Sequence, residues 1–126
     1  MHKSIQNYKD IISAINRKKE EQKINFTPKI IAVSKTFKLE KILPLIDYGH
    51  LDYGENKVQE AIEKWSDIKL EKPNIKLHLI GKLQTNKVKH AIKIFDYIHS
   101  VDSLKLAKKI ADEQYKQKKI LSYLFK

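Results

Sequence analysis

The sequence predicts an α/β protein built around a parallel β-sheet. Short apolar runs typical of strands recur every 20 to 25 residues, and segments with the period of an α-helix lie between them. This alternation indicates right-handed strand–helix–strand units, whose neighbouring strands run parallel. The predicted strands are Lys29–Ser34, Leu51–Gly54, Lys76–Gly81, Tyr97–Val101 and Ile120–Phe125.

The segments between these strands repeat apolar residues every three or four positions, as a helix with one buried face requires. An extra amphipathic helix is expected within residues 1–23, ahead of the first strand. Leu39–Tyr48 is the next predicted helix, and Gly49 occupies the position that commonly ends one. Pro44 is expected to kink this helix or to start a shorter one. Three later stripes predict three further helices: Val58, Ala61, Ile62 and Trp65; Val88, Ala91, Ile92 and Phe95; Leu104, Ala107, Ile110 and Ala111.

Two architectures share this rhythm, an open doubly wound sheet and a closed (β/α)₈ barrel of the TIM type. The three glycines of the chain stand apart, so the glycine-rich phosphate loops of Rossmann and P-loop folds are absent. The barrel is therefore the favoured fold. With 126 residues we expect one domain over 1–126, made of the N-terminal helix (1–23) and of strand–helix units over 29–126.

The amino-acid composition argues against nucleic acids and membranes as binding partners. The net charge of +11 is typical of nucleic-acid binding, but Arg17 is the only arginine among 26 basic residues. The bidentate fork that reads phosphates and guanine edges is thus nearly missing, and we do not expect a nucleic-acid partner. No apolar run approaches the ~18–20 residues that span a bilayer, so no membrane partner is expected. The absence of cysteine fits a reducing cytoplasm.

One lysine, Lys35, follows an apolar run at the carboxyl end of the first predicted strand. Ligands of parallel α/β folds bind at that end of the strands. Apolar surroundings desolvate an ammonium group, which makes the neutral amine available to attack a carbonyl and form a Schiff base. The alternative is a lysine that extends its charged head into water.

Four stretches together resemble the pyridoxal phosphate homeostasis protein family. In chain order they are AVSKT (Ala32–Thr36), YGENKVQE (Tyr53–Glu60), LHLIGKLQTNK (Leu77–Lys87) and IHSVDS (Ile98–Ser103). The resemblance covers about residues 1 to 119 and implies a barrel like the N-terminal domain of alanine racemase. It implies that Lys35 carries pyridoxal 5′-phosphate as an internal aldimine. It also implies a non-catalytic protein that binds and delivers or buffers vitamin B6, with effects on amino-acid and keto-acid pools.

Two more residues are candidates for contact with the cofactor. Asn56 follows the second strand and lies at the ligand end, but with Gln59 it also resembles a capping box for the next helix. His78 alternates with Leu77 and Leu79, so it faces the barrel interior below the cofactor or is a hydrogen-bonded core histidine. Gln84–Asn86 and Asp102–Ser103 follow the third and fourth strands at the same end, where they suit helix caps equally well.

The chain is shorter than the ~250 residues of a whole barrel. We therefore expect an incomplete half-barrel of about four to five strands, from a truncated, frameshifted or split gene. Its open strand edges favour self-association. Two other functions remain open: a pyridoxal-phosphate enzyme such as an amino-acid racemase that uses Lys35, and a basic nucleic-acid-binding module.

Overall fold

The computed structural model describes residues 2–119 and 122–125 and divides into two compact units. One unit comprises Met1–Ile30 and Lys38–His50, and the other comprises Ile31–Phe37 and Leu51–Lys126. The first contains two helices, and the second contains the whole sheet with the remaining helices. The single domain expected over residues 1–126 stays a prediction.

The first unit consists of helix α1 (Lys3–Gln22) and helix α2 (Leu39–Tyr48). The Tyr8 ring of α1 packs edge-on against Tyr48, with ring centroids 6.0 Å apart, and this contact joins the two helices. Helix α2 has the predicted bounds, and Gly49 ends it with φ 109°, a conformation that glycine adopts without steric cost. Pro44 lies inside α2, so it does not start a shorter helix.

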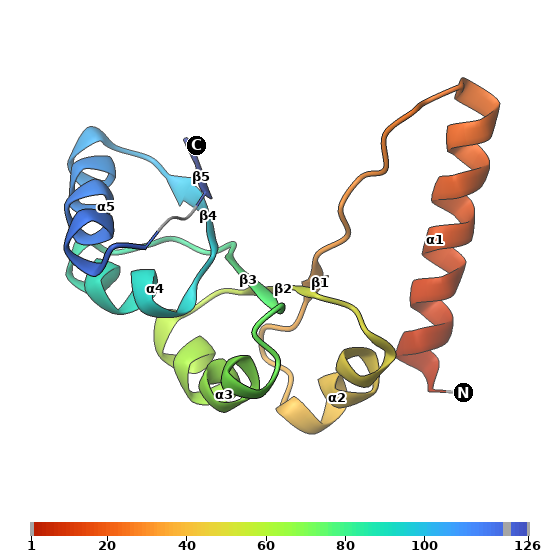
Figure 1. The fold of residues 1–126 in the computed structure, drawn as a ribbon, viewed down its shortest axis with the longest axis horizontal. Helices are drawn as coiled ribbons and strands as arrows, with labels where there is room; N and C mark the ends of the chain where they lie inside the picture. The colour runs from red at the N-terminus through yellow and green to blue at the C-terminus, as the bar shows by residue number, and fades with distance from the viewer. Residues whose placement is uncertain (1, 120–121, 126) are drawn as a thin grey trace. The chain divides into compact units, whose positions relative to one another are not determined.

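The second unit is built on a five-stranded sheet in which every pair of neighbours is parallel (Figure 1). The strand order follows the chain: β1 (Ala32–Val33), β2 (Asp52–Glu55), β3 (Lys76–Leu79), β4 (Tyr97–Val101) and β5 (Ser122–Phe125). All five predicted strands are present, and β4 has the predicted bounds. Ile120 and Leu121, the first two residues of the predicted fifth strand, lie outside the described residues.

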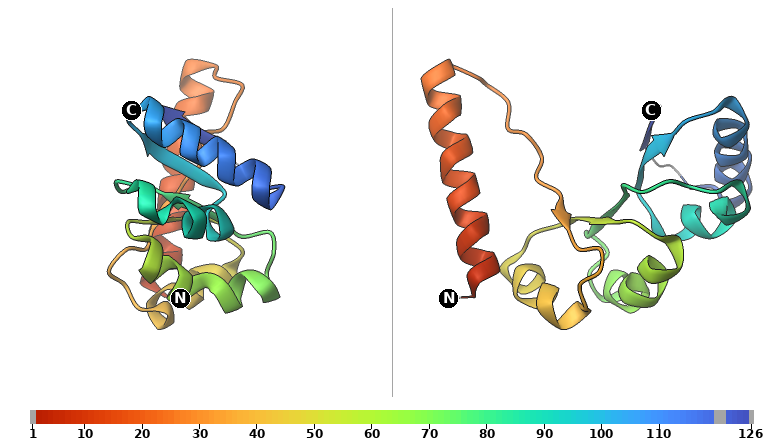
Figure 2. Two further views of the ribbon diagram at one scale, coloured as in Figure 1. Left: turned by 90° about the vertical axis from the view of Figure 1, so that its left-hand side faces the viewer. Right: turned by 180° about the vertical axis from the view of Figure 1, so that it is seen from behind.

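The helices of this unit all lie on one face of the sheet, as the views in Figure 1 and Figure 2 agree. They are α3 (Val58–Glu71), α4 (Val88–Ile94), which follows the short 3₁₀ helix η1 (Thr85–Lys87), and α5 (Leu104–Gln117). A right-handed crossover between adjacent strands in unchanging order places each helix on the same side. A doubly wound sheet reverses its order and carries helices on both faces. The topology therefore confirms the predicted fold class, an incomplete (β/α)₈ barrel.

The core of the second unit lies between the sheet and these helices. Tyr53 of β2 packs on Trp65 of α3 with ring centroids 4.8 Å apart, and both residues are fully buried. The residues of the three predicted helical stripes that are completely buried are Ala61, Trp65, Val88, Ala91, Ile92, Phe95 and Ile110. Among the described residues, no helix is long and apolar enough to cross a membrane.

The first strand is less buried than its apolar sequence indicates. Of the predicted strand Lys29–Ser34, Ala32 and Val33 form strand β1, and Val33 is 50% exposed. The reason is position, because β1 is the first strand of the order and pairs with β2 alone. A strand with one neighbour keeps one edge and much of its surface in solvent.

Candidate functional site

Lys35 sits at the second position of a tight turn directly after β1. The Phe37 N–H donates to the Ser34 carbonyl oxygen at 3.2 Å, which closes the turn. Thr36, at the third position, has φ 68°, the left-handed conformation that a type II turn requires there. A β-branched residue rarely adopts this conformation, so the backbone beside Lys35 is strained. Lys35 itself is exposed, so the desolvation expected from its apolar strand is not present in this chain.

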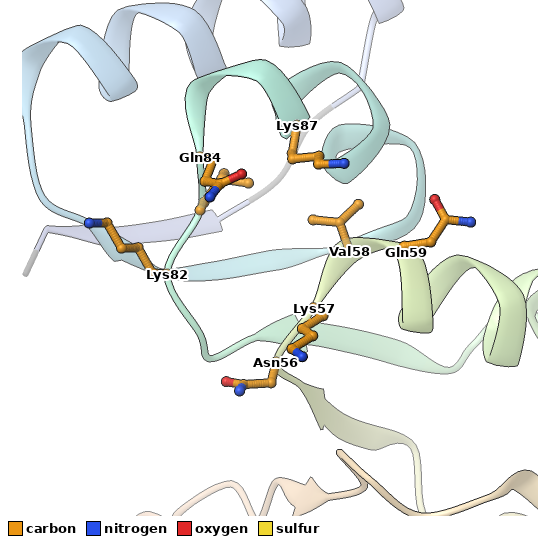
Figure 3. Close-up of a pocket in the computed structure, with 8 residues that line it drawn as sticks. Asn56, Lys57, Val58, Gln59, Lys82, Gln84 and Lys87 are labelled. Carbon is orange, nitrogen blue, oxygen red and sulfur yellow. The ribbon is translucent and has the colours of Figure 1, made fainter.

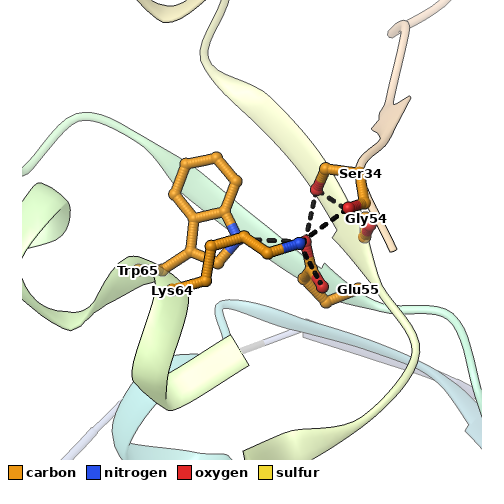
Figure 4. Close-up of polar contacts among 5 residues, drawn as sticks. All are labelled: Ser34, Gly54, Glu55, Lys64 and Trp65. Carbon is orange, nitrogen blue, oxygen red and sulfur yellow. Dashed lines mark hydrogen bonds and ion pairs between the residues drawn. The ribbon is translucent and has the colours of Figure 1, made fainter. Parts of the chain in front are cut away.

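A buried polar cluster holds the residue that precedes Lys35 (Figure 4). The carboxylate of Glu55, at the end of β2, is fully buried. It accepts hydrogen bonds from the Ser34 hydroxyl at 2.5 Å and from Trp65 Nε1 at 3.0 Å. Lys64 of α3 supplies the counter-charge, with its Nζ atom 3.0 Å from Oε2 of Glu55.

The Lys64 ammonium also reaches the backbone of the turn. Its Nζ atom donates to the Ser34 carbonyl oxygen at 2.7 Å. That oxygen is the same acceptor that closes the turn with Phe37. The Ser34 N–H donates in turn to the Gly54 carbonyl oxygen at 2.9 Å. Every polar group of Ser34 is therefore bonded, to β2, to α3 or across its own turn.

Asn56 follows Glu55 and lines a pocket of about 350 Å³ at the carboxyl end of β2 and β3 (Figure 3). The eight residues that line it include three lysines and no carboxylate: Asn56, Lys57, Val58, Gln59, Lys82, Leu83, Gln84 and Lys87. Such a lining attracts anions, and side-chain amides add hydrogen-bond donors. The pocket is therefore suited to an anionic group of a small ligand.

Asn56 does not cap the next helix, so that interpretation of the sequence was wrong. The N-cap of α3 is Lys57, and no side chain bonds to the first turn there. Asn56 packs instead against Gly81, in the loop after β3. The capping pattern failed because the helix begins one residue later than the pattern assumes.

His78 lies within β3, below the edge where Lys35 and Asn56 are found. It pairs in register with Gly54, is 2% exposed, and faces away from the helices, as its alternation with Leu77 and Leu79 predicts. Its Nε2 atom is 2.8 Å from Asp52 Oδ1, and its Nδ1 atom is 2.9 Å from His99 Nε2. The ring stacks on Tyr97 at 4.3 Å. These contacts favour a hydrogen-bonded core histidine, and its contact with the cofactor stays a prediction.

The structure thus brings Lys35 and Asn56 to one edge of neighbouring strands and sets His78 deeper in the sheet. Gln84 lines the pocket beside Asn56. Ser103 is a helix cap, the alternative role that its position in the sequence allowed. Its hydroxyl oxygen accepts from the Leu106 N–H at 3.1 Å at the start of α5.

Sequence reasoning missed Ser34, Glu55 and Lys64. The available signal was Glu55 itself, a carboxylate at the end of a strand whose preceding residues are buried. A buried charge needs a partner, so such a residue predicts an ion pair. Which of the many lysines provides that pair is visible only in three dimensions.

No protein-family model matches the chain. It is 36% identical over 124 residues to the pyridoxal phosphate homeostasis protein of Vibrio alginolyticus, covering 94% of this chain and 52% of that protein. The protein of the same name from Buchnera aphidicola is 43% identical over 91 residues, which are 72% of this chain and 38% of that protein. The chain thus spans about half the length, or less, of these curated relatives.

Solved structures give the same picture. PipY of Synechococcus elongatus, solved with pyridoxal phosphate bound, is 34% identical with a TM-score of 0.71, over 86% of this chain and 52% of PipY. An unknown protein from Bifidobacterium adolescentis has a TM-score of 0.79 at 27% identity, over 91% of this chain and 51% of that protein.

The fold and the turn over residues 34–37 together define the first half of a parallel barrel, with the amine of Lys35 at the carboxyl end of its first strand. Within that class, the chain is similar to proteins named pyridoxal phosphate homeostasis protein, of which it covers about half or less, and to PipY.

Proposed function

We propose that this chain binds pyridoxal 5′-phosphate and serves vitamin B6 homeostasis, together with amino-acid and keto-acid balance, without catalysing a reaction. Lys35 is the amine that forms a Schiff base with the aldehyde of the cofactor. The single observation that carries the proposal is the placement of Lys35 at the carboxyl end of β1, on a turn whose first residue, Ser34, is hydrogen-bonded to Glu55 and Lys64. The name of the relatives and the ligand of PipY support it.

The residues around Lys35 fit such a ligand. When bound, the cofactor supplies an aldehyde for reversible condensation with an amine, and a phosphate that needs positive charge or N–H donors. The exposed amine of Lys35 is accessible to the aldehyde. Lys57 and Lys87 supply positive charge in the pocket beside Asn56, at the same edge of the sheet.

The non-catalytic assignment rests on the relatives, which are named for homeostasis and not for a reaction. A racemase also requires a proton donor or acceptor on the face of the cofactor opposite the lysine. His78 does not suit that task, because its two ring nitrogens already contact Asp52 and His99. The cytoplasm remains the expected location.

The test is to trap the adduct. The chain is incubated with pyridoxal phosphate, reduced with borohydride, digested and mapped by mass spectrometry. We expect Lys35 to be the most heavily labelled lysine, and Lys35→Ala to lose that label while the other lysines keep theirs. Lys38→Ala is the matched control, since Lys38 is also exposed and lies three residues away.

Label spread evenly over the surface lysines, with no excess at Lys35, contradicts the proposal. A parallel incubation with phosphate-free pyridoxal tests the pocket. If Lys57 and Lys87 bind the phosphate, the preference for the phosphorylated form falls in Lys87→Met.

A further inference from the structure

Burying the Glu55–Lys64 ion pair costs this small protein desolvation free energy. Both charges are withdrawn from water, since the Glu55 side chain is 0% exposed and that of Lys64 is 12% exposed. Such a pair is often no more stabilising than apolar residues of the same volume, so its presence calls for another explanation.

The second hydrogen-bond acceptor of Lys64, the Ser34 carbonyl oxygen, suggests that explanation. Its ammonium bridges the Glu55 carboxylate and the Ser34 carbonyl oxygen, and the Glu55 carboxylate accepts from the Ser34 hydroxyl. The pair is therefore hydrogen-bonded to both the backbone and the side chain of Ser34, the residue before Lys35. One residue beyond Lys35, Thr36 holds a positive φ that threonine avoids.

We propose that the buried Glu55–Lys64 pair is a positioning device for Lys35, because it holds the strained turn over residues 34–37 in the conformation that presents the amine. Strain of this kind disfavours a turn roughly 5- to 150-fold against relaxed alternatives. The bonds from Lys64 and Glu55 to Ser34 reverse that preference. The role given to the amine rests on the proposed function, but the hold on the turn does not.

The same helix offers a matched control. Lys69 of α3 is 17% exposed, and its Nζ atom lies 2.6 Å from Asp96 Oδ2 and 3.0 Å from the Ile94 carbonyl oxygen. It thus bonds one carboxylate and one backbone carbonyl, as Lys64 does, but these belong to Asp96, directly before β4, and to Ile94, the last residue of α4. Lys64→Met and Lys69→Met each remove one such ammonium, and only the first releases the turn.

The first measurement is amide hydrogen exchange of Phe37, whose N–H closes the turn. We expect exchange at least about tenfold faster in Lys64→Met, the change that loss of one charge-assisted hydrogen bond produces, and no change in Lys69→Met. Ser34→Ala removes only the hydroxyl link and leaves the ion pair intact, so we expect a smaller acceleration. If Lys64→Met does not fold, Ser34→Ala decides the question.

The second measurement is the share of trapped pyridoxal phosphate found at Lys35, at equal fractions of folded chain. It should fall several-fold in Lys64→Met and stay constant in Lys69→Met. Equal effects of the two lysine variants on Phe37 exchange, or wild-type exchange in both Lys64→Met and Ser34→Ala, overturn the positioning role. Absence of excess label at Lys35 in the wild type instead overturns the proposed function, and the exchange data then judge the positioning role alone.

Discussion

Asn56 lies so close to Gly81 that a Cβ atom at residue 81 would be 2.3 Å from Asn56 Oδ1 and 2.4 Å from the Asn56 carbonyl oxygen. On its other side, the Gly81 carbonyl oxygen accepts from the Ser100 hydroxyl at 2.6 Å. The segments after β2 and β3 are thereby joined to each other and to Ser100 of β4. Gly81 is needed here for its lack of a side chain.

Gly81→Ala is therefore expected to destabilise the fold by about 2–3 kcal/mol, since a backbone atom must move to admit the methyl group. Gly54→Ala is the control, because its Cβ would meet only the side chains of Ile31 and Ile80, at 3.2 and 3.3 Å. Urea unfolding followed by the fluorescence of Trp65 measures both. An equal cost for the two variants would show that the Asn56 contact yields easily.

Thr36→Gly should stabilise the chain by about 1 kcal/mol. Glycine adopts a positive φ without the strain of about 1–3 kcal/mol, although its greater freedom in the unfolded chain offsets part of the gain. The gain should persist in the Lys64→Met background, where it also slows Phe37 exchange again. Thr36→Ser keeps the strained geometry and serves as control. Loss of stability in Thr36→Gly would mean that the turn is not strained.

His78→Gln should lower the free energy of unfolding by about 2 kcal/mol, because the contacts with Asp52 and His99 are lost in a buried site. At equal fractions of folded chain, label at Lys35 should be unchanged. His90→Gln, at an exposed position, is expected to have no effect on either quantity. A selective loss of Lys35 label in folded His78→Gln would instead support contact between His78 and the cofactor.

Lys119 should make the free energy of unfolding depend on pH in the alkaline range. Burial lowers the pKa of Lys119 below its usual 10.5, and Lys69 and Lys76 add to this effect while Asp96 opposes it. Between the lowered pKa and 10.5 the unfolded chain binds a proton that the folded chain does not, so stability rises with pH in that window.

Lys119→Met removes this penalty. We expect the variant to be more stable than the wild type at pH 7 and the difference to shrink as the pH approaches 10.5. Urea unfolding at several pH values measures it, with the exposed Lys108→Met as control. A difference that is independent of pH would contradict the assigned cause.

Most of the fold could be predicted because periodicity is local. β4 and α2 have the predicted bounds, and Gly49 ends α2 as expected. The extent of β1 could not be predicted in this way. Its apolar residues suit a buried strand, but burial depends on how many neighbours a strand has, and β1 has one.

In the candidate site, too, some residues could be predicted from local sequence and others could not. Lys35 was predictable, because the end of a strand is a local feature, and the structure places it at that end. The contacts of Asn56 with Gly81 and of Lys64 with Ser34 join residues 25 and 30 positions apart, which no local pattern specifies. In a chain with 26 basic residues, the partner of Glu55 is invisible until the helix is placed.

Helix α3 has a consequence for the order in which this chain folds. Lys64 reaches back 30 residues to Ser34, and Lys69 reaches forward 27 residues to Asp96, so one short helix joins segments far before and far after it in the chain. If α3 docks before either segment arrives, an ammonium is left buried without its partner. We therefore expect the helix, the turn over residues 34–37 and the segment before β4 to become ordered in one cooperative step.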